Sequence, residues 1–172
     1  KLIEKNGKPK GQSFLHIAGA NGLLTRFLQE RGARAVNFDY DPKLCDLARK
    51  FGNKEVVEGD ALKKLPFKHN EFNCLITDHF VFAGYRIVDL GLTSKNKYSG
   101  SESIIKEASR VVKPNGIFVI NSIDIRNPLP EMMEICHKYF GKVEPYAYGH
   151  QTPGSGKDQL VPGLILSKPR KN

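Results

Sequence analysis

Residues 14–41 read FLHIAGANGLLTRFLQERGARAVNFDYD, and this stretch decides the fold. The apolar run Phe14–Ala18 predicts a strand, and it leads straight into the short turn Gly19–Gly22. Behind the turn, apolar residues recur at the spacing of an amphipathic helix, which places four of them on one face: Leu23, Leu24, Phe27 and Leu28. The stretch therefore predicts a strand, a tight turn and a helix in succession.

A second strand is expected at Ala35–Phe38, and it ends on two carboxylates, Asp39 and Asp41. In an open parallel sheet, ligands bind beyond the carboxyl ends of the strands, where helix N-termini expose unpaired N–H groups. A carboxylate at the end of the second strand can accept both hydroxyls of a ribose. The two strands therefore predict half of a nucleotide-binding site.

Two later strands are followed by acidic residues as well. The strand expected at Glu55–Val57 is followed by Asp60, and the strand expected at Phe72–Thr77 by Asp78 and His79. Because the carboxyl ends of parallel strands meet at one edge of a sheet, we expect these side chains close to the first turn.

Helical patterns separate the strands. Asp41 is a natural N-cap and Pro42 suits the first turn of a helix that ends at Gly52. A second amphipathic pattern covers residues 101–112, with Ser101 as its candidate N-cap. The segment 80–100 carries glycines and a polar run, so we expect a loop or lid over the rim of the sheet.

The last part of the chain changes character. The turn Lys113–Gly116 precedes a fifth strand, and a helix is expected at Pro130–Tyr139. Two strands, Gly141–Ala147 and Leu160–Ser167, flank the turn-rich HQTPGSGKDQ, which is typical of an antiparallel hairpin at a sheet edge. We therefore expect an α/β fold: a doubly wound, mostly parallel sheet with helices on both faces and a C-terminal antiparallel hairpin.

Length and composition fit one domain over residues 1–172, with residues 1–12 as a flexible lead-in to the first strand. The chain is 40% apolar and 26% charged, and no apolar run approaches the ~20 residues that span a bilayer. The basic start KLIEKNGKPKG has no apolar segment behind it, so we expect a cytoplasmic protein. The cysteines Cys45, Cys74 and Cys136 suit buried free thiols.

The net charge of +9 is the one unusual feature of the composition. It allows a polyanionic partner such as RNA. Many of the lysines are scattered in pairs or lie near the two ends of the sequence, where solubility alone explains them.

From Phe14 to Val119 the chain resembles the class I S-adenosylmethionine-dependent methyltransferases. The resemblance rests on five motifs in the family's order: HIAGANG, VNFDYDPKLCDLAR, GDALKKLPF, FNCLITDH and EASRVVKPNGIFVI. No single motif is specific, but their joint order and spacing are. A terminal antiparallel hairpin is also what this family adds to a Rossmann-like sheet.

The resemblance implies S-adenosyl-L-methionine as the cofactor, held first by the glycine loop and the second strand. The loop, with Ala18, Gly19, Ala20 and Gly22, would pass beneath the methionine part of the cofactor. Asp39 would bind the ribose hydroxyls, and Tyr40 would lie against the adenine.

The same resemblance gives roles to the third and fourth strands. Asp60 would accept a hydrogen bond from the adenine amino group, with the backbone of Ala61 alongside. Asp78, with His79 beside it, would border the sulfonium and the acceptor, where an imidazole could serve as a base. No Cys, His, Asp or Glu cluster has metal-ligand spacing, so no metal is assigned.

Three residues depart from the family's pattern. The family usually has an acidic residue at the position of His16 and glycines at the positions of Ala18 and Ala20. Alanine disfavours a positive φ, and the missing acid removes a partner for the cofactor's ammonium group. A non-catalytic scaffold that binds a partner protein or nucleic acid therefore stays open beside the enzyme.

The acceptor is open as well. The fourth strand ends Thr77-Asp78-His79-Phe80 and not in the Asn/Asp-Pro-Pro-aromatic run of base-amine methyltransferases, so a small-molecule acceptor is favoured. Four tyrosines could line its pocket: Tyr85, Tyr98, Tyr146 and Tyr148. A nicotinamide-dependent oxidoreductase is less consistent with the sequence, because the first turn is not G-x-G-x-x-G.

Overall fold

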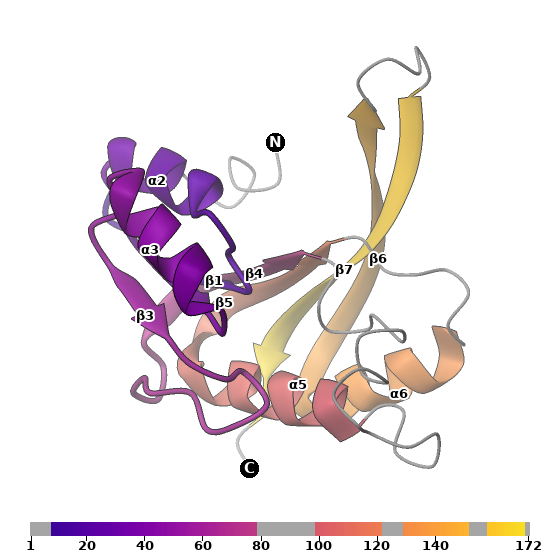
Figure 1. Cartoon of the computed structure of the whole chain (residues 1–172). Coiled ribbons are helices and arrows are strands. Elements are labelled where there is room, and N and C mark those ends of the chain that lie inside the picture. The colour runs from indigo at the N-terminus through magenta and orange to yellow at the C-terminus, as the bar shows by residue number, and fades with distance from the viewer. Residues whose placement is uncertain (1–7, 79–98, 122–128, 152–157, 171–172) are drawn as a thin grey trace.

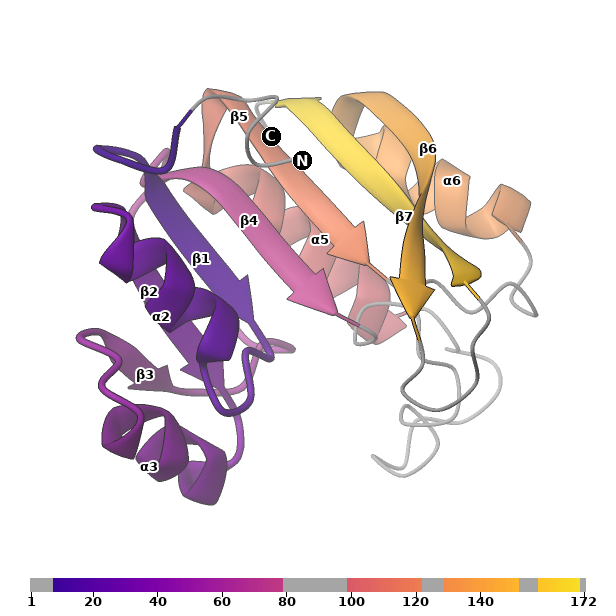
Figure 2. The same ribbon diagram turned by 90° about the horizontal axis from the view of Figure 1, so that it is seen from above.

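The computed structural model describes residues 8–78, 99–121, 129–151 and 158–170. Its strands are β1 (Ser13–Ile17), β2 (Arg34–Asp39), β3 (Val56–Glu58), β4 (Phe72–Asp78), β5 (Val112–Asn121), β6 (Phe140–Gln151) and β7 (Asp158–Pro169). Within these residues they form one sheet in the order β3-β2-β1-β4-β5-β7-β6 (Figure 2). Strands β1 to β5 pair in parallel, and β7 pairs antiparallel with β5 and β6.

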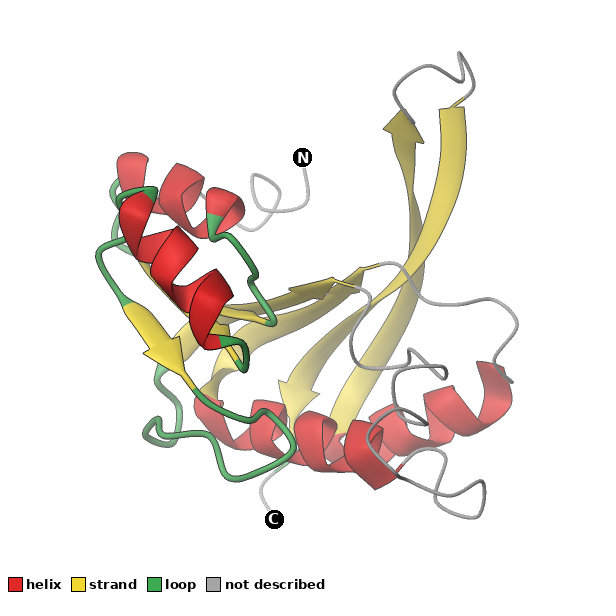
Figure 3. Cartoon of the chain, viewed as in Figure 1, coloured by secondary structure: helices red, strands yellow, loops and turns green. Residues whose placement is uncertain are grey.

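Four helices of the described chain cover the two faces of this sheet. They are α2 (Leu23–Glu30), α3 (Pro42–Lys50), α5 (Ser99–Val111) and α6 (Leu129–Tyr139). Helices α2 and α3 lie over one face, and α5 and α6 lie over the other (Figures 1 and 3). The expected α/β architecture is confirmed. None of the described helices combines the length and the apolarity that a membrane span requires.

The core is divided by the sheet into two clusters. The larger one includes Phe72 and Phe118, and it also takes in Ile104 of α5 and Met132 of α6. The smaller one, on the side of α2, contains Phe14 and Ile76 among others. Burying each of these large side chains contributes about 1.5–3 kcal/mol, so the helices are fixed mainly by the sheet faces they cover.

Helix α2 is rotated from the orientation that its apolar residues predict. Leu28 is buried and Leu24 packs against the core, but Leu23 and Phe27, expected on the same apolar face, are 58% and 45% exposed. The polar residues Thr25 and Gln29 are buried instead. Gln29 Nε2 donates to the backbone oxygen of Ala35 at 2.6 Å, and this bond fixes the rotation of the helix against β2.

The expected caps are partly confirmed. Asp41 caps α3 by accepting a hydrogen bond from the Lys43 N–H at 2.8 Å, and Gly52 follows the helix at a φ of 83°. Ser101, in contrast, is not an N-cap. Helix α5 begins at Ser99, so Ser101 lies buried inside its first turn.

The segment Lys113–Gly116, expected as a turn, lies within β5. The pairing of β4 with β5 moves from Phe72–Val112 directly to Cys74–Ile117, so these residues form a bulge in the ladder. A Cβ at Gly116 would lie 2.7 Å from the Asn73 carbonyl oxygen, which explains the glycine there.

The C-terminal hairpin is longer than the sequence predicts. Strand β7 pairs with β5 only from Leu164 to Ser167. Strands β6 and β7 stay paired as far as Gln151 and Asp158, and their ribbon rises beyond the sheet on the side of α2 (Figures 1 and 3). His79 and most of the lid expected at residues 80–100 lie outside the described residues.

Candidate functional site

The register of the sheet brings three chain segments to one level. Ile17, the last residue of β1, pairs with Phe38 of β2 on one side and with Thr77 of β4 on the other. The residues one position further along the chain are Ala18, Asp39 and Asp78, and they lie at the carboxyl-end edge of the sheet. We call this edge the rim. This is the edge at which parallel sheets bind ligands.

The loop after β1 keeps a left-handed backbone despite its alanines. Ala18 has φ 56°, Ala20 has φ 48° and Gly22 has φ 71°. For an alanine this conformation costs roughly 1–2 kcal/mol. The loop thus has the left-handed backbone conformation that glycine adopts easily, although alanine occupies positions 18 and 20.

Two side chains of β2 hold the peptide groups of Ala20. Asp39 Oδ2 accepts a hydrogen bond from the Ala20 N–H at 2.8 Å, and Asn37 Nδ2 donates to the Ala20 carbonyl oxygen at 3.1 Å. A Cβ at Gly19 would lie 2.0 Å from Asn37 Oδ1, so this position requires glycine. Surrounding contacts of this kind allow a strained backbone to persist.

The carboxylate of Asp39 is buried but retains capacity to accept. The residue is 7% exposed, and Oδ1 accepts a second hydrogen bond from the Asp41 N–H at 3.0 Å. Each carboxylate oxygen can accept two hydrogen bonds. Because each oxygen of Asp39 accepts one from the backbone, each can accept one more. A ribose at this edge would share the carboxylate with Ala20. Tyr40, the next residue, is 71% exposed and can present its ring to a base.

Strand β3 brings Asp60 to the same rim. The Gly59 N–H donates to the Asp39 carbonyl oxygen at 2.9 Å, which joins the ends of β3 and β2. Asp60 Oδ1 accepts from the Leu62 N–H at 2.9 Å, and its side chain is 27% exposed. Ala61 is buried beside it. Two acidic residues and an exposed tyrosine thus line the rim next to the loop, and this set suits an adenosine.

On the other side of β1, Asp78 is held by two neighbours. His16 Nε2 lies 3.3 Å from Asp78 Oδ2, and Asn121 Nδ2 donates to Asp78 Oδ1 at 2.7 Å. Because a carboxylate only accepts, the first contact requires a proton on Nε2. The hydroxyl of Tyr146 in β6 donates to Asn121 Oδ1. Of the tyrosines expected around an acceptor, Tyr146 is thus turned toward the rim.

His16 extends this series of contacts to the loop. Its Nδ1 lies 3.5 Å from the Thr25 hydroxyl, which donates to Asn37 Oδ1 at 3.2 Å. Asn37 in turn holds Ala20. We call these residues the rim network; its side chains are Tyr146, Asn121, Asp78, His16, Thr25 and Asn37.

Sequence reasoning identified some members of the rim network and missed others. Asp78 was expected from its position after the fourth strand, and His16 was noticed as a departure from the family's pattern. Thr25, Asn37 and Asn121 were not expected. The available signal was that all three are polar residues inside otherwise apolar strands or on an inward helix face.

The cysteines are buried, and Cys45 is beside the rim, where its Sγ donates to the Asp39 carbonyl oxygen at 3.6 Å. All three are free and buried, as expected. Burial raises the pKa of Cys74 and of Cys136 to about 12. Burial, assisted by the nearby charge of Asp39, also raises the pKa of Cys45 above its usual value. Thiols that stay protonated are poor nucleophiles and poor metal ligands.

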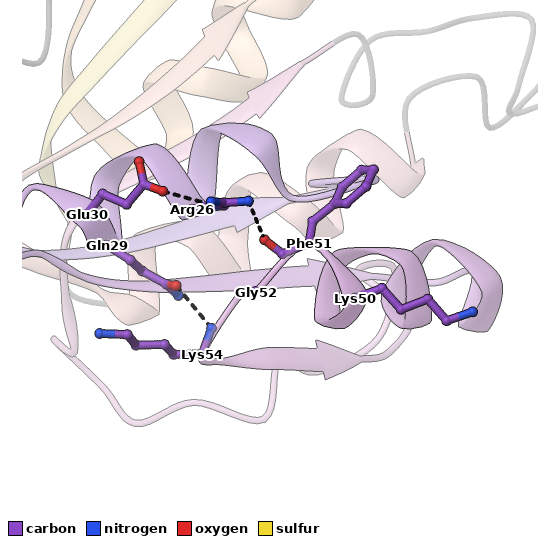
Figure 4. A pocket seen from close by; sticks show the side chains of 7 residues that line it. All are labelled: Arg26, Gln29, Glu30, Lys50, Phe51, Gly52 and Lys54. Carbon is purple, nitrogen blue, oxygen red and sulfur yellow. Dashed lines mark hydrogen bonds and ion pairs between the residues drawn. The ribbon is translucent and has the colours of Figure 1, made fainter.

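A cavity of about 340 Å³ lies away from the rim, between the second half of α2 and the segment after α3 (Figure 4). Arg26 crosses it, donating to Glu30 Oε1 at 2.8 Å and to the Phe51 carbonyl oxygen at 2.9 Å. These contacts tie α2 to the end of α3. The cavity therefore belongs to the packing of the two helices, and the candidate site is the rim.

Comparison with known proteins identifies relatives of the chain. Residues 15–120 match the family model described as a methyltransferase domain. Demethylmenaquinone methyltransferases from Chlorobaculum parvum and Chlorobaculum tepidum are 29% and 26% identical over 99% of this chain. The chain spans 64% and 63% of their respective lengths.

The fold has close counterparts among solved structures. A TehB-like SAM-dependent methyltransferase from Corynebacterium glutamicum superimposes with a TM-score of 0.69 at 18% identity. The match covers 97% of this chain and 85% of the other. At this identity the likeness establishes the architecture alone.

Proposed function

The chain belongs to the methyltransferase domain family, and from this premise we propose that it transfers the methyl group of S-adenosyl-L-methionine to a small-molecule acceptor in the cytoplasm. The observation that carries the proposal is the rim, where Asp39 and Asp78 flank the loop after β1 at one level of the sheet. The exposed ring of Tyr40 and the carboxylate of Asp60 complete a surface that suits an adenosine.

In this proposal, different residues bind the ribose, the adenine and the methionine part of the cofactor. Asp39 accepts from the ribose hydroxyls while it keeps its bond to Ala20, and Tyr40 packs on the adenine. Asp60 and the backbone of Ala61 bind the edge of the adenine. The loop, with Ala18, Gly19, Ala20 and Gly22, passes beneath the methionine part.

When bound, the cofactor supplies an electrophilic methyl group on a sulfonium. Transfer to a good nucleophile depends chiefly on alignment and on exclusion of water, so a dedicated base is not required. We assign Asp78 to the methionine part and the acceptor; its position at the end of β4 and the 40% exposure of its side chain support this assignment. His79 remains a proposed neighbour of the acceptor.

The acceptor class is supported by the relatives. Both Chlorobaculum proteins are named for methylation of demethylmenaquinone, a small molecule, and they align with nearly the whole of this chain. We therefore favour a small-molecule acceptor over RNA.

A non-catalytic scaffold is the second candidate, favoured by the net charge of +9 and by the strained alanines of the loop. Binding of RNA through such a charge would weaken steeply as salt rises, because bound counterions are released. RNA binding at low salt together with no binding of the cofactor would favour this candidate.

Calorimetric titration with S-adenosylhomocysteine tests the enzyme proposal. We expect micromolar affinity and a rise in the unfolding temperature with ligand. Asp39→Asn should weaken binding at least about tenfold, because a charge-assisted bond to the ribose is lost. Asp46→Asn is the matched control, since Asp46 is an exposed carboxylate on α3 paired with Arg49. No heat and no thermal shift at millimolar ligand would overturn the proposal.

A further inference from the structure

Tyr146 reaches the rim because its partner across the hairpin is a glycine. Tyr146 of β6 pairs with Gly163 of β7. A Cβ at position 163 would lie 2.5 Å from Tyr146 Cε1 and 2.6 Å from the Ile120 carbonyl oxygen. Only a residue without a side chain leaves this space to the ring. The ring therefore lies over Gly163 and carries its hydroxyl to Asn121.

The Asn121 amide is held at both of its ends. The carboxylate of Asp78 only accepts, so it takes the Nδ2 end of the amide, which donates to Asp78 Oδ1 at 2.7 Å. The other end, Oδ1, accepts from the hydroxyl of Tyr146. Without this hydroxyl the amide is held by Asp78 alone, and its position against the carboxylate is less restricted.

Asp78 is thus oriented from both sides and still reaches the surface. His16 Nε2 contacts Oδ2 at 3.3 Å, and Asn121 holds Oδ1, while 40% of the side chain stays exposed. A carboxylate held by two donors at the end of β4 is preorganised for a ligand group beside it.

We infer that Tyr146 is a positioning residue of the methyl-transfer site: its hydroxyl orients Asn121, and Asn121 orients Asp78 toward the amino-acid part of the cofactor. This inference rests on the proposed function. It gives the C-terminal hairpin a part in cofactor binding, although Tyr146 itself does not touch the ligand.

The test compares two ligands on Tyr146→Phe. S-adenosylhomocysteine carries the amino-acid chain, whereas 5′-methylthioadenosine carries the adenosine and lacks that chain. Loss of the hydroxyl should weaken S-adenosylhomocysteine binding about fivefold, and binding of methylthioadenosine should change less than about twofold. Asn121→Ala should produce a similar loss, and the double variant should be no weaker than Asn121→Ala, since both changes act through one contact.

Tyr139→Phe is the matched control. The Tyr139 hydroxyl donates to Glu102 Oε1 at 2.9 Å between α6 and α5, outside the rim network. This variant should leave the affinity for both ligands unchanged.

The outcomes separate this inference from the function it rests on. If the unmodified protein binds S-adenosylhomocysteine and Tyr146→Phe binds it equally well, the inference fails and the proposed function stands. Equal weakening of both ligands by Tyr146→Phe would also overturn it, because the hydroxyl would then act on the fold as a whole. If the unmodified protein binds neither ligand, both proposals fail.

Discussion

The backbone N–H of Ala20 donates to the carboxylate of Asp39 at 2.8 Å, and this bond spans the loop after β1 and the end of β2. It joins a strained alanine, at φ 48°, to the residue proposed to bind the ribose. The same carboxylate therefore shapes the loop and, in our proposal, binds the ligand. A loop already held in this way would reduce the ordering that binding of the proposed cofactor must impose.

Replacing Ala20 by glycine should stabilise the protein. Glycine relieves the left-handed strain of roughly 1–2 kcal/mol but has a more flexible unfolded state, so we expect a net gain of up to about 1 kcal/mol in the free energy of unfolding. Urea titration measures it. The control Ala48→Gly, in the buried part of α3, should lose about 1 kcal/mol or more. A loss for Ala20→Gly would show that the alanine is not strained.

Two buried threonines should respond oppositely to replacement by valine. Within the described residues, the Thr77 hydroxyl has no hydrogen-bond partner, whereas the Thr25 hydroxyl donates to Asn37. Thr77→Val should therefore raise the free energy of unfolding by about 1 kcal/mol, and Thr25→Val should lower it by about 1–2 kcal/mol. Chemical denaturation of both variants checks this. Destabilisation by Thr77→Val would indicate that its hydroxyl is satisfied in solution.

Glu107 should contribute to stability in a pH-dependent way. Burial alone would raise its pKa, but hydrogen bonds from Arg110 and from the Leu65 N–H lower the pKa below its ordinary value of 4.5. A carboxyl group whose pKa is lower in the folded state stabilises it above pH 4.5 and loses that contribution as the pH falls through the folded-state pKa.

Glu107→Gln should therefore cost about 1–2 kcal/mol at pH 7, and the deficit should shrink as the pH falls below 4.5. Denaturation curves at a series of pH values measure it. Glu30→Gln is the control, because Glu30 forms an exposed pair with Arg26 and should change stability by less than about 0.5 kcal/mol. If Glu107→Gln lowered the free energy of unfolding by the same amount at every pH, the lowered pKa of Glu107 in the folded state would be contradicted.

The fold was largely predictable because its signals are local. Asp41 before Pro42 marks the start of α3, Gly52 marks its end, and the carboxylates follow short apolar runs rich in β-branched and aromatic residues, which favour strands. The apolar face of α2 was predicted correctly for Leu24 and Leu28 but not for Leu23 and Phe27. Gln29 and Thr25 hydrogen-bond to β2, and helical periodicity alone does not reveal these contacts.

The rim was predictable only in part. Asp39, Asp60 and Asp78 could be named because each lies at the end of a strand or just after it. The contacts of Asp78 with Asn121 and His16 depend on the register between β1, β4 and β5, and the pattern of each strand taken alone does not show how it pairs with the others. The reach of Tyr146 depends on Gly163, which lies opposite it only once the hairpin is paired.

The most direct measurement is a crystal structure with S-adenosylhomocysteine. We expect the ribose hydroxyls on the carboxylate of Asp39, the adenine between Tyr40 and Asp60, and the amino-acid part beside Asp78. A ligand bound elsewhere, with Asp39 engaged only by Ala20 and Asp41 and the rim filled by the alanine methyl groups, would contradict this expectation.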